Sequence, residues 1–178
     1  MDPYKFIEKY YSDNRELKRI LITHSEQVAE KALKIAQAHP EFNLDTLFLE
    51  EAALLHDIGI YQTNAPAIHC YGTSPYLQHG LLGAELLRAE GYPGHARVCE
   101  RHTGTGLTKE TIEQQRLPLP SKDFSPETWE EKVICFADKF FSKTRLGQEK
   151  TPEQALHSLQ KFGPESVARF TKWMELFL

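Results

Sequence analysis

The sequence is poor in cysteine, has no long apolar run and has no excess of basic residues. Its three cysteines are odd in number and form no CxxC pair, so we expect reduced thiols and not a disulfide framework. No apolar stretch approaches the roughly 18 residues of a membrane-spanning helix, and Met1-Asp2-Pro3-Tyr4-Lys5 begins no signal peptide. The formal net charge of −4 lacks the basic footprint of nucleic-acid-binding proteins. We therefore expect a cytoplasmic protein with no membrane partner and no nucleic-acid partner.

The chain has the size and composition of one soluble globular domain. It contains 178 residues, of which 40% are hydrophobic and 26% are charged. Apolar residues recur at helical spacing along most segments, and no segment shows the alternation of a strand. No internal repeat or low-complexity linker divides the chain. We predict one all-α domain over residues 1–178, a helical bundle of roughly seven to nine helices.

Proline, glycine and capping residues predict where the helices begin and end. Expected helices cover residues 3–11, 16–38, 44–58, 79–91, 95–102, 108–116 and 151–163, and a last helix carries Val167, Phe170, Met174 and Phe177 on one stripe. Ser125-Pro126-Glu127 predicts the start of a long helix that continues through Asp138 to Lys139, Lys143 and Arg145. Pro93-Gly94 predicts a turn followed by an exposed His95 without a role. Residues 60–78 have no clean period, so we expect a long irregular loop, and such loops are usually functional.

The adjacent pair His56-Asp57 lies at the end of an apolar run and is followed at once by Gly59. Neighbouring residues of a helix point about 100° apart, so the pair cannot lie wholly in solvent while the flanking leucines face a core. A buried carboxylate is costly unless a cation or strong donors compensate its charge. Histidine and aspartate together suit iron, manganese, cobalt, nickel or zinc.

Four further residues are poorly explained as ordinary surface. His24 lies in an apolar stripe, His79 at a helix start, His102 at a helix end, and Asp138 inside the apolar run 133–141. Taken singly, His24 also fits a core histidine bonded to a backbone carbonyl, His102 a helix-capping histidine, and Asp138 an ion pair with Arg145. Taken together, four histidines and two aspartates are what two metal ions about 3.5–4 Å apart need, with one carboxylate bridging them.

The order and context of these six residues resemble those of the HD-domain metal-dependent phosphohydrolases of the HDIG type, in their dinuclear-metal subgroup. The matching motifs are His56-Asp57-Ile58-Gly59, Ala137-Asp138-Lys139, His79-Gly80-x-x-Gly83-Ala84 and His102 after Arg101. The resemblance covers about residues 17–146 and leaves 151–178 as a C-terminal helical extension. It implies that His24, His56, Asp57 and Asp138 hold one metal ion, and that Asp57 bridges to a second ion held by His79 and His102. The implied cofactors are two divalent or mixed-valence ions, iron being favoured over manganese, nickel, cobalt or zinc.

The resemblance also implies a reaction. We expect hydrolysis of a nucleotide or other small phosphorylated metabolite by a metal-bridged hydroxide, with Asp57 as the catalytic residue that bridges the metals and orients the nucleophile. Similar dinuclear iron enzymes hydrolyse diadenosine tetraphosphate. The candidate substrate-binding residues are Arg101, Thr103, Thr105, Lys109, Lys139 and Arg145, with Lys122 as a further basic residue. The alternative for each basic residue is a solvated surface position.

Two other classes of function use the same sequence features. The six ligands would serve a mixed-valence di-iron oxygenase of the same fold equally well, and oxygen consumption would separate the two chemistries. A non-catalytic nucleotide-binding domain is the third candidate, although it has no need of two open metal sites. The apolar stripe ending at Trp173-Met174-Glu175-Leu176-Phe177-Leu178 covers either the core or a second subunit, so a homodimer is left open.

Overall fold

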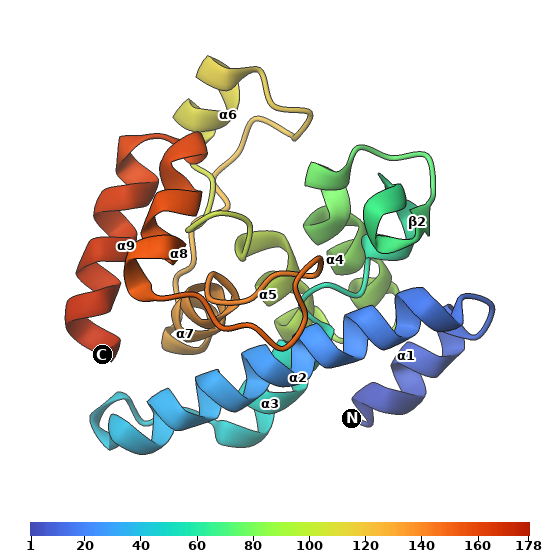
Figure 1. Cartoon of the computed structure of the whole chain (residues 1–178), viewed down its shortest axis with the longest axis horizontal. Helices are drawn as coiled ribbons and strands as arrows, with labels where there is room; N and C mark the ends of the chain where they lie inside the picture. The colour runs from blue at the N-terminus through green and yellow to red at the C-terminus, as the bar shows by residue number, and fades with distance from the viewer.

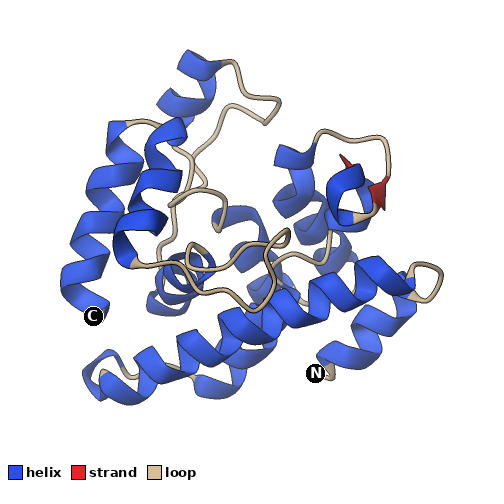
Figure 2. Cartoon of the chain, in the orientation of Figure 1, coloured by secondary structure: helices blue, strands red, loops and turns tan.

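The computed structural model describes residues 1–178, which fold into nine α-helices joined by loops and short 3-10 turns (Figures 1 and 2). The helices are α1 (Pro3–Tyr11), α2 (Arg15–Ala38), α3 (Thr46–Leu55), α4 (His79–Ala89), α5 (Pro93–Arg101), α6 (Lys109–Gln115), α7 (Trp129–Asp138), α8 (Pro152–Leu159) and α9 (Pro164–Phe177). The predicted all-α class is confirmed, and nine helices fall within the predicted range. No helix has both the length and the apolar character needed to cross a membrane.

Side-chain caps explain most helix starts. Asp2, Asn14, Asp45 and Thr108 each accept a hydrogen bond from a backbone N–H in the first turn of the helix that follows. Thr151 forms a reciprocal capping box with Gln154 and precedes a proline at the first helical position. These starts lie within two residues of the predicted ones.

The predicted start and end of α7 are wrong. The helix begins at Trp129, because Thr128 and Glu131 form a capping box two to three residues beyond the expected Ser125-Pro126 start. It ends at Asp138, with Lys139 as its C-cap, so Lys143 and Arg145 lie in the following loop and not on the helix. Asp138 is therefore a helix-end residue, and it makes no ion pair with Arg145.

Four smaller predictions also need correction. The structure has one antiparallel pair of two-residue strands, β1 (Asn64–Ala65) and β2 (Cys70–Tyr71), within the expected irregular loop. Strands this short show no alternation in a sequence. Helix α3 ends at Leu55 and not at Ile58, while α5 begins at Pro93, where a turn was expected. His95 is half-buried, and its Nε2 lies 3.1 Å from Glu51 Oε2, so it is not an exposed residue without contacts.

Two apolar clusters form the core, and α2 contributes to both. The first joins the C-terminal half of α2 with α3, α7, α8 and α9, and the second joins the N-terminal half of α2 with α1, α4 and α5. Figure 1 shows α2 running across the molecule, with α1 near one end and α9 toward the other. Along α2, Leu21 belongs to the second cluster and Val28 to the first, with His24 between them. The boundary between the clusters is therefore where a polar group can be buried among several helix ends.

Two glycines allow α4 to approach this boundary closely. A Cβ at Gly59 would lie 2.3 Å from the backbone oxygen of His79, and a Cβ at Gly80 would lie 2.4 Å from that of Cys99. Both distances are too short for any side chain. The absence of side chains at Gly59 and Gly80 thus lets the start of α4 pack directly on the segment after α3 and on α5.

Candidate metal centre

Six side chains from five parts of the chain converge at this boundary. His24 comes from the middle of α2, His56 and Asp57 follow α3, His79 opens α4, His102 follows α5, and Asp138 ends α7. Their potential ligand atoms form two groups, each with all atoms within 4.8 Å of one another. One group comprises His24, His56, Asp57 and Asp138, and the other comprises Asp57, His79 and His102. We call these six residues the centre.

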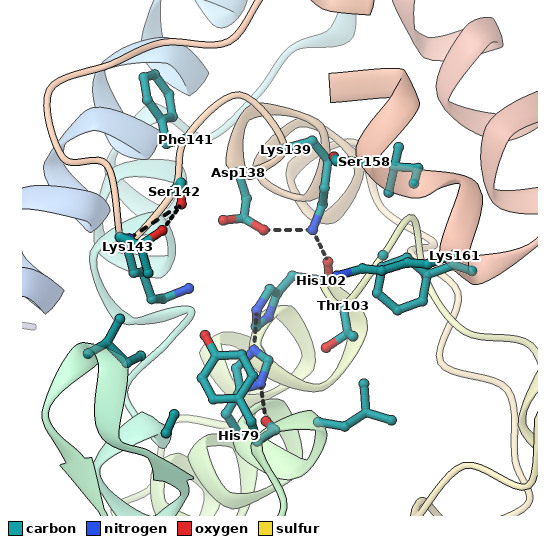
Figure 3. Close-up of a pocket in the computed structure, with 18 of the residues that line it drawn as sticks. His79, His102, Thr103, Asp138, Lys139, Phe141, Ser142, Lys143, Ser158 and Lys161 are labelled. Atoms are coloured by element: carbon teal, nitrogen blue, oxygen red, sulfur yellow. Dashed lines mark hydrogen bonds and ion pairs between the residues drawn. The ribbon is translucent and has the colours of Figure 1, made fainter. Parts of the chain in front are cut away.

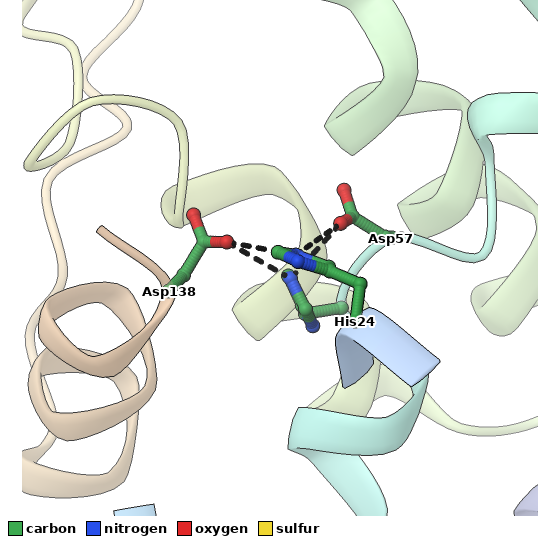
Figure 4. Close-up of side chains that lie close together, drawn as sticks. His24, Asp57 and Asp138 are labelled. Atoms are coloured by element: carbon green, nitrogen blue, oxygen red, sulfur yellow. Dashed lines mark hydrogen bonds and ion pairs between the residues drawn. The ribbon is translucent and has the colours of Figure 1, made fainter. Parts of the chain in front are cut away.

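Asp57 belongs to both groups, and each of its oxygens faces a different one. Its Oδ2 lies 3.2 Å from His24 Nε2 and 3.0 Å from His56 Nε2. Its Oδ1 lies 3.3 Å from His79 Nε2 and 3.4 Å from His102 Nε2. Asp138 Oδ1 completes the first group, 3.0 Å from His24 Nε2, so that His24 lies between the two carboxylates (Figure 4). Asp57, with one oxygen toward each group, is thus placed as a carboxylate that bridges the two groups.

Backbone carbonyls fix the orientation of three of the histidines. The Nδ1–H groups of His56, His79 and His102 donate to the carbonyl oxygens three residues earlier, at 2.6, 2.7 and 2.7 Å respectively. Because a carbonyl can only accept, Nδ1 must carry the proton. In the neutral ring, Nε2 is then left with a lone pair directed into the centre. Metal-ligating histidines are oriented in this way by a partner on the other ring nitrogen.

Several buried polar atoms of the centre have no hydrogen-bond partner within the protein. They are His24 Nδ1, His56 Nε2 and both carboxylate oxygens of Asp57, although the Lys143 ammonium lies in ion-pair contact with Asp57 Oδ2. In addition, the Nε2 atoms of His79 and His102 face each other at 3.0 Å. Unsatisfied buried carboxylate oxygens are costly, and two facing lone pairs repel. A cation in each group would satisfy the carboxylate oxygens and the Nε2 atoms that face it, but not His24 Nδ1, because His24 faces its group through Nε2. The residues present therefore fit two metal ions with mixed nitrogen and oxygen ligands.

The electrostatics of the centre keep its two carboxylates and two of its histidines, His79 and His102, in states that bind metals. Burial lowers the pKa of His79 to about 3 and also lowers that of His102, so both rings are neutral. Burial opposes ionisation of Asp57, yet Lys143 and His56 outweigh it and hold its pKa well below the usual value. Asp138 is likewise held ionised against burial, by Lys139 and His24. The carboxylates are therefore charged and the second pair of histidines is uncharged.

His56 is the exception among these histidines. Burial disfavours its protonation, but the adjacent Asp57 and Asp138 outweigh that effect and raise its pKa to about 9. In the chain alone, the imidazolium of His56 and the ammonium of Lys143 supply positive charge to Asp57. The negative charge of Asp57 is thus compensated by two positively charged side chains when no metal ion is bound.

A cavity of about 470 Å³ leads from the centre to solvent. We call the part lined by His79, His102, Asp138, Lys139 and Lys143 its inner end. Figure 3 shows Lys143 and Lys161 on opposite sides of this cavity, with Thr103 between them. Lys139 Nζ donates to Asp138 Oδ2 at 2.6 Å and to the carbonyl of His102 at 2.8 Å. Phosphoryl oxygens entering this cavity would meet ammonium groups beside the centre.

The structure separates the predicted substrate-binding residues into two sets. Thr103 and Lys139 line the cavity. The other four do not line it. Arg101 bonds the Ser125 carbonyl and Glu127, Thr105 is buried against Ser166, Lys109 is exposed on α6, and Arg145 is exposed in the loop after α7. Lys122 pairs with Glu100 and is also outside the cavity.

Sequence reasoning missed three lysines that line the cavity: Lys143, Lys150 and Lys161. Lys143 and Lys150 follow Asp138 within twelve positions, so their proximity to a ligand was a usable signal. No feature of the sequence pointed to Lys161, because this residue reaches the cavity only through the packing of the segment after α8. Its position depends on tertiary structure.

The fold and the centre together define an all-α protein with a candidate dinuclear metal site. The HD domain family matches residues 21–142, and the chain belongs to this family. All six residues of the centre lie within the matched region.

Relatives from archaea align with most of the chain. An uncharacterized protein of Methanocaldococcus jannaschii is 35% identical over 128 residues, which cover 70% of this chain and 68% of that protein. Two proteins named tRNA (cytidine(56)-2′-O)-methyltransferase also match. That of Picrophilus torridus is 38% identical over 71% of this chain, and that of Thermoplasma volcanium is 31% identical over 89%. The chain spans only 33% and 41% of their respective lengths.

Solved structures of the same fold include the HD domain of the phosphodiesterase PgpH from L. monocytogenes. Its complex with cyclic-di-AMP superposes with a TM-score of 0.56 at 18% identity and covers 93% of this chain and 91% of that one. A second structure of the domain gives a TM-score of 0.51 and covers 89% and 94%. At this identity the likeness establishes the shared fold.

Proposed function

We propose that this chain is a metal-dependent phosphohydrolase that acts on a nucleotide or another small phosphorylated metabolite. The observation that carries the proposal is the shared Asp57 carboxylate, with one oxygen toward each group of histidines and a lysine-lined cavity opening onto both. Two metal ions bridged in this way suit phosphoryl-transfer chemistry. Membership of the HD family supports the same conclusion.

Each residue of the centre has a proposed role. His24, His56, Asp57 and Asp138 would hold one metal ion, and Asp57, His79 and His102 the other. When bound, the ions supply the positive charge that activates water and neutralises a phosphoryl group. The protein contributes the fixed orientation of the His56, His79 and His102 rings through their Nδ1–H bonds. Lys139 and Lys143 line the inner end of the cavity and can donate hydrogen bonds to phosphoryl oxygens.

The names of the relatives support the proposal unequally. The PgpH HD domain is a phosphodiesterase domain that binds a cyclic dinucleotide, which is consistent with a nucleotide substrate here. The methyltransferase name belongs to proteins of which the chain spans a minor part. We therefore assign no methyl transfer to this chain.

The test is metal analysis of freshly purified protein, combined with phosphate release from a panel of nucleotides, dinucleotides and sugar phosphates on the same sample. We expect about two metal ions per chain and release of phosphate, or of a shortened nucleotide, from part of the panel. A chain that retains no metal after reloading would contradict the proposal, because the centre would then be a structural polar cluster.

The same sample separates the two alternative functions. Oxygen consumption by the iron-loaded protein without hydrolysis would indicate the di-iron oxygenase, whose ligand set is identical. Nucleotide binding with metal but without turnover would indicate a binding domain. Hydrolysis of even one compound of the panel that disappears with Asp57→Asn supports the phosphohydrolase over both.

A further inference from the structure

The outer end of the cavity carries two lysine ammonium groups that lie in no ion pair. Four lysines line the cavity, and two of them are paired: Lys139 with Asp138 and Lys143 with Asp57. Lys150 and Lys161 form no ion pair. Glu149, the residue before Lys150, pairs instead with Lys31 on α2. We call Lys150 and Lys161 the outer lysines.

Lys150 is held in an unfavourable setting for an unpaired cation. Its ammonium is half-buried and donates to the backbone carbonyl of Lys139 at 3.2 Å. Burial lowers its pKa, the Asp138 carboxylate opposes that effect, and the ammonium groups of Lys139, Lys161 and Lys143 lower the pKa further. Lysine side chains normally extend into water to avoid such crowding. Lys150 does so only in part, and three other lysines line the same cavity.

Lys161 approaches the cavity from a different segment. It lies in the 3-10 turn Gln160–Phe162 after α8, and its ammonium lies 5.0 Å from the centre of the Phe162 ring. Phe162 and Ser158 line the cavity beside it. Both outer lysines lie beyond residue 142, where the family match ends. The two outer lysines are therefore supplied by the part of the chain that follows the matched region.

We propose that Lys150 and Lys161 form a second anion subsite that binds a further phosphate group of the substrate, beyond the one held at the centre. The inference deepens the proposed function and rests on it for the identity of the inner group. A substrate with a single phosphate would leave the outer lysines without a partner. The chemical class selected is thus a compound with an oligophosphate chain or a second phosphate.

The subsite is tested by calorimetric titration of the full chain, loaded with the metal found on purification, with inorganic tripolyphosphate and with orthophosphate. Metal content is measured after each titration, because tripolyphosphate itself binds metal ions. We expect the Lys150→Gln/Lys161→Gln variant to bind tripolyphosphate about tenfold more weakly, which is the effect of losing a charge-assisted contact. Its affinity for orthophosphate should change by less than about twofold.

Three further variants keep the result interpretable. Lys161→Gln alone removes an exposed side chain with no hydrogen bond, so it tests the subsite without altering Lys150 or the fold. Lys161→Arg should restore binding of tripolyphosphate. The matched control is Lys172→Gln, at an exposed lysine of α9 that does not line the cavity. Equal weakening of both anions by the outer variants, or weakening of neither, would overturn the proposal.

Titration of the chelator-treated protein separates this proposal from the proposed function. Tripolyphosphate binding that depends on the outer lysines, in a chain that hydrolyses nothing in the panel, supports the subsite while the proposed function fails. Hydrolysis with no such dependence in either metal state supports the proposed function while the subsite fails. ATP serves as a second probe. If ATP binds more tightly than tripolyphosphate and its binding also depends on the outer lysines, the oligophosphate that the subsite binds is part of a nucleotide and not inorganic polyphosphate.

Discussion

The inner and outer ends of the cavity are built by opposite means. At the inner end, histidine rings are fixed by hydrogen bonds to backbone carbonyls three residues earlier, and the histidine side chains are almost fully buried. At the outer end, Lys150 and Lys161 lie on a loop and a 3-10 turn, with one exposed and one half-buried. The inner geometry is thus set by the fold before any ligand arrives, whereas the outer end supplies charge on flexible stems. Changes at the inner end should abolish function, and changes at the outer end should only tune it.

Asp57→Asn should produce the largest effect, because it alters the one side chain shared by both groups of the centre. An amide supplies one neutral oxygen where the carboxylate has two charged ones, so one metal site loses its oxygen ligand and the other keeps only a neutral one. We expect metal content to fall and hydrolysis to drop by more than about a hundredfold, which is the upper range for a supporting residue of a metal site. Elemental analysis and phosphate release measure the two quantities.

The matched control for this variant is Asp13→Asn, at an exposed aspartate between α1 and α2. It should keep both metal and activity. Full metal content and full turnover in Asp57→Asn would show that the two groups do not share this carboxylate as a bridge.

Gly59→Ala tests how the fold brings the two halves of the inner end together. The new Cβ would lie 2.3 Å from the His79 backbone oxygen and 2.4 Å from the Gly83 nitrogen. Helix α4 must therefore move away, which should cost about 2 kcal/mol of unfolding free energy and weaken binding of the metal that His79 and His102 would hold. Urea unfolding and metal analysis measure these changes.

Gly94→Ala is the control for Gly59→Ala, since its Cβ would meet only the Phe48 ring at an ordinary 3.4 Å. It should leave stability nearly unchanged. If Gly59→Ala is equally harmless, close approach of α4 is not what assembles the centre.

The sequence was sufficient to predict the six residues of the centre and most helices, for a physical reason. A histidine or aspartate within an apolar stripe, such as His24 or Asp138, interrupts the apolar pattern of its own helix. That interruption can be read from the sequence alone. Capping residues are equally local, which is why the start of α8 was predicted correctly. The start of α7 was predicted wrongly at Ser125, although Thr128 and Glu131 have the local spacing of a capping box.

The lysines of the cavity could not be selected from the sequence in the same way. Most lysines are solvated, and Lys161 differs from the others only through the packing of the segment after α8. Arg101 and Lys109 had equal support from the sequence, yet the first bonds Glu127 and the second is exposed on α6. The lysines of the outer end are therefore recognisable only from the tertiary structure, whereas the polar residues of the inner end stand out in the local sequence.

Lys143→Gln sharpens the comparison, because Lys143 lies at the inner end but is a lysine like those of the outer end. Its ammonium contacts Asp57 Oδ2 and lies 6.0 Å from the centre of the Tyr76 ring. We expect binding of orthophosphate and tripolyphosphate to weaken by similar factors, about tenfold each. Lys161→Gln should weaken tripolyphosphate alone. Lys143→Arg retains the charge and should recover most of the lost affinity. If Lys143→Gln weakened binding of tripolyphosphate but not of orthophosphate, Lys143 would behave like an outer lysine, and the distinction between the inner and outer ends would be wrong.

The smallest effect should come from His95, a histidine outside the centre that also contacts a carboxylate. Burial lowers its pKa below the ordinary value of 6.5, against the opposing effect of Glu51. As the pH falls through that value, the unfolded chain takes up a proton that the folded chain resists, so His95 makes the protein less stable at lower pH. His95→Gln cannot titrate, and it should therefore lose less unfolding free energy between pH 7.5 and 5.5 than the native chain, as measured by urea unfolding. The matched variant is His157→Gln, at an exposed histidine of α8. If both variants reduce the pH dependence of the unfolding free energy equally, burial of His95 is not the cause of that dependence.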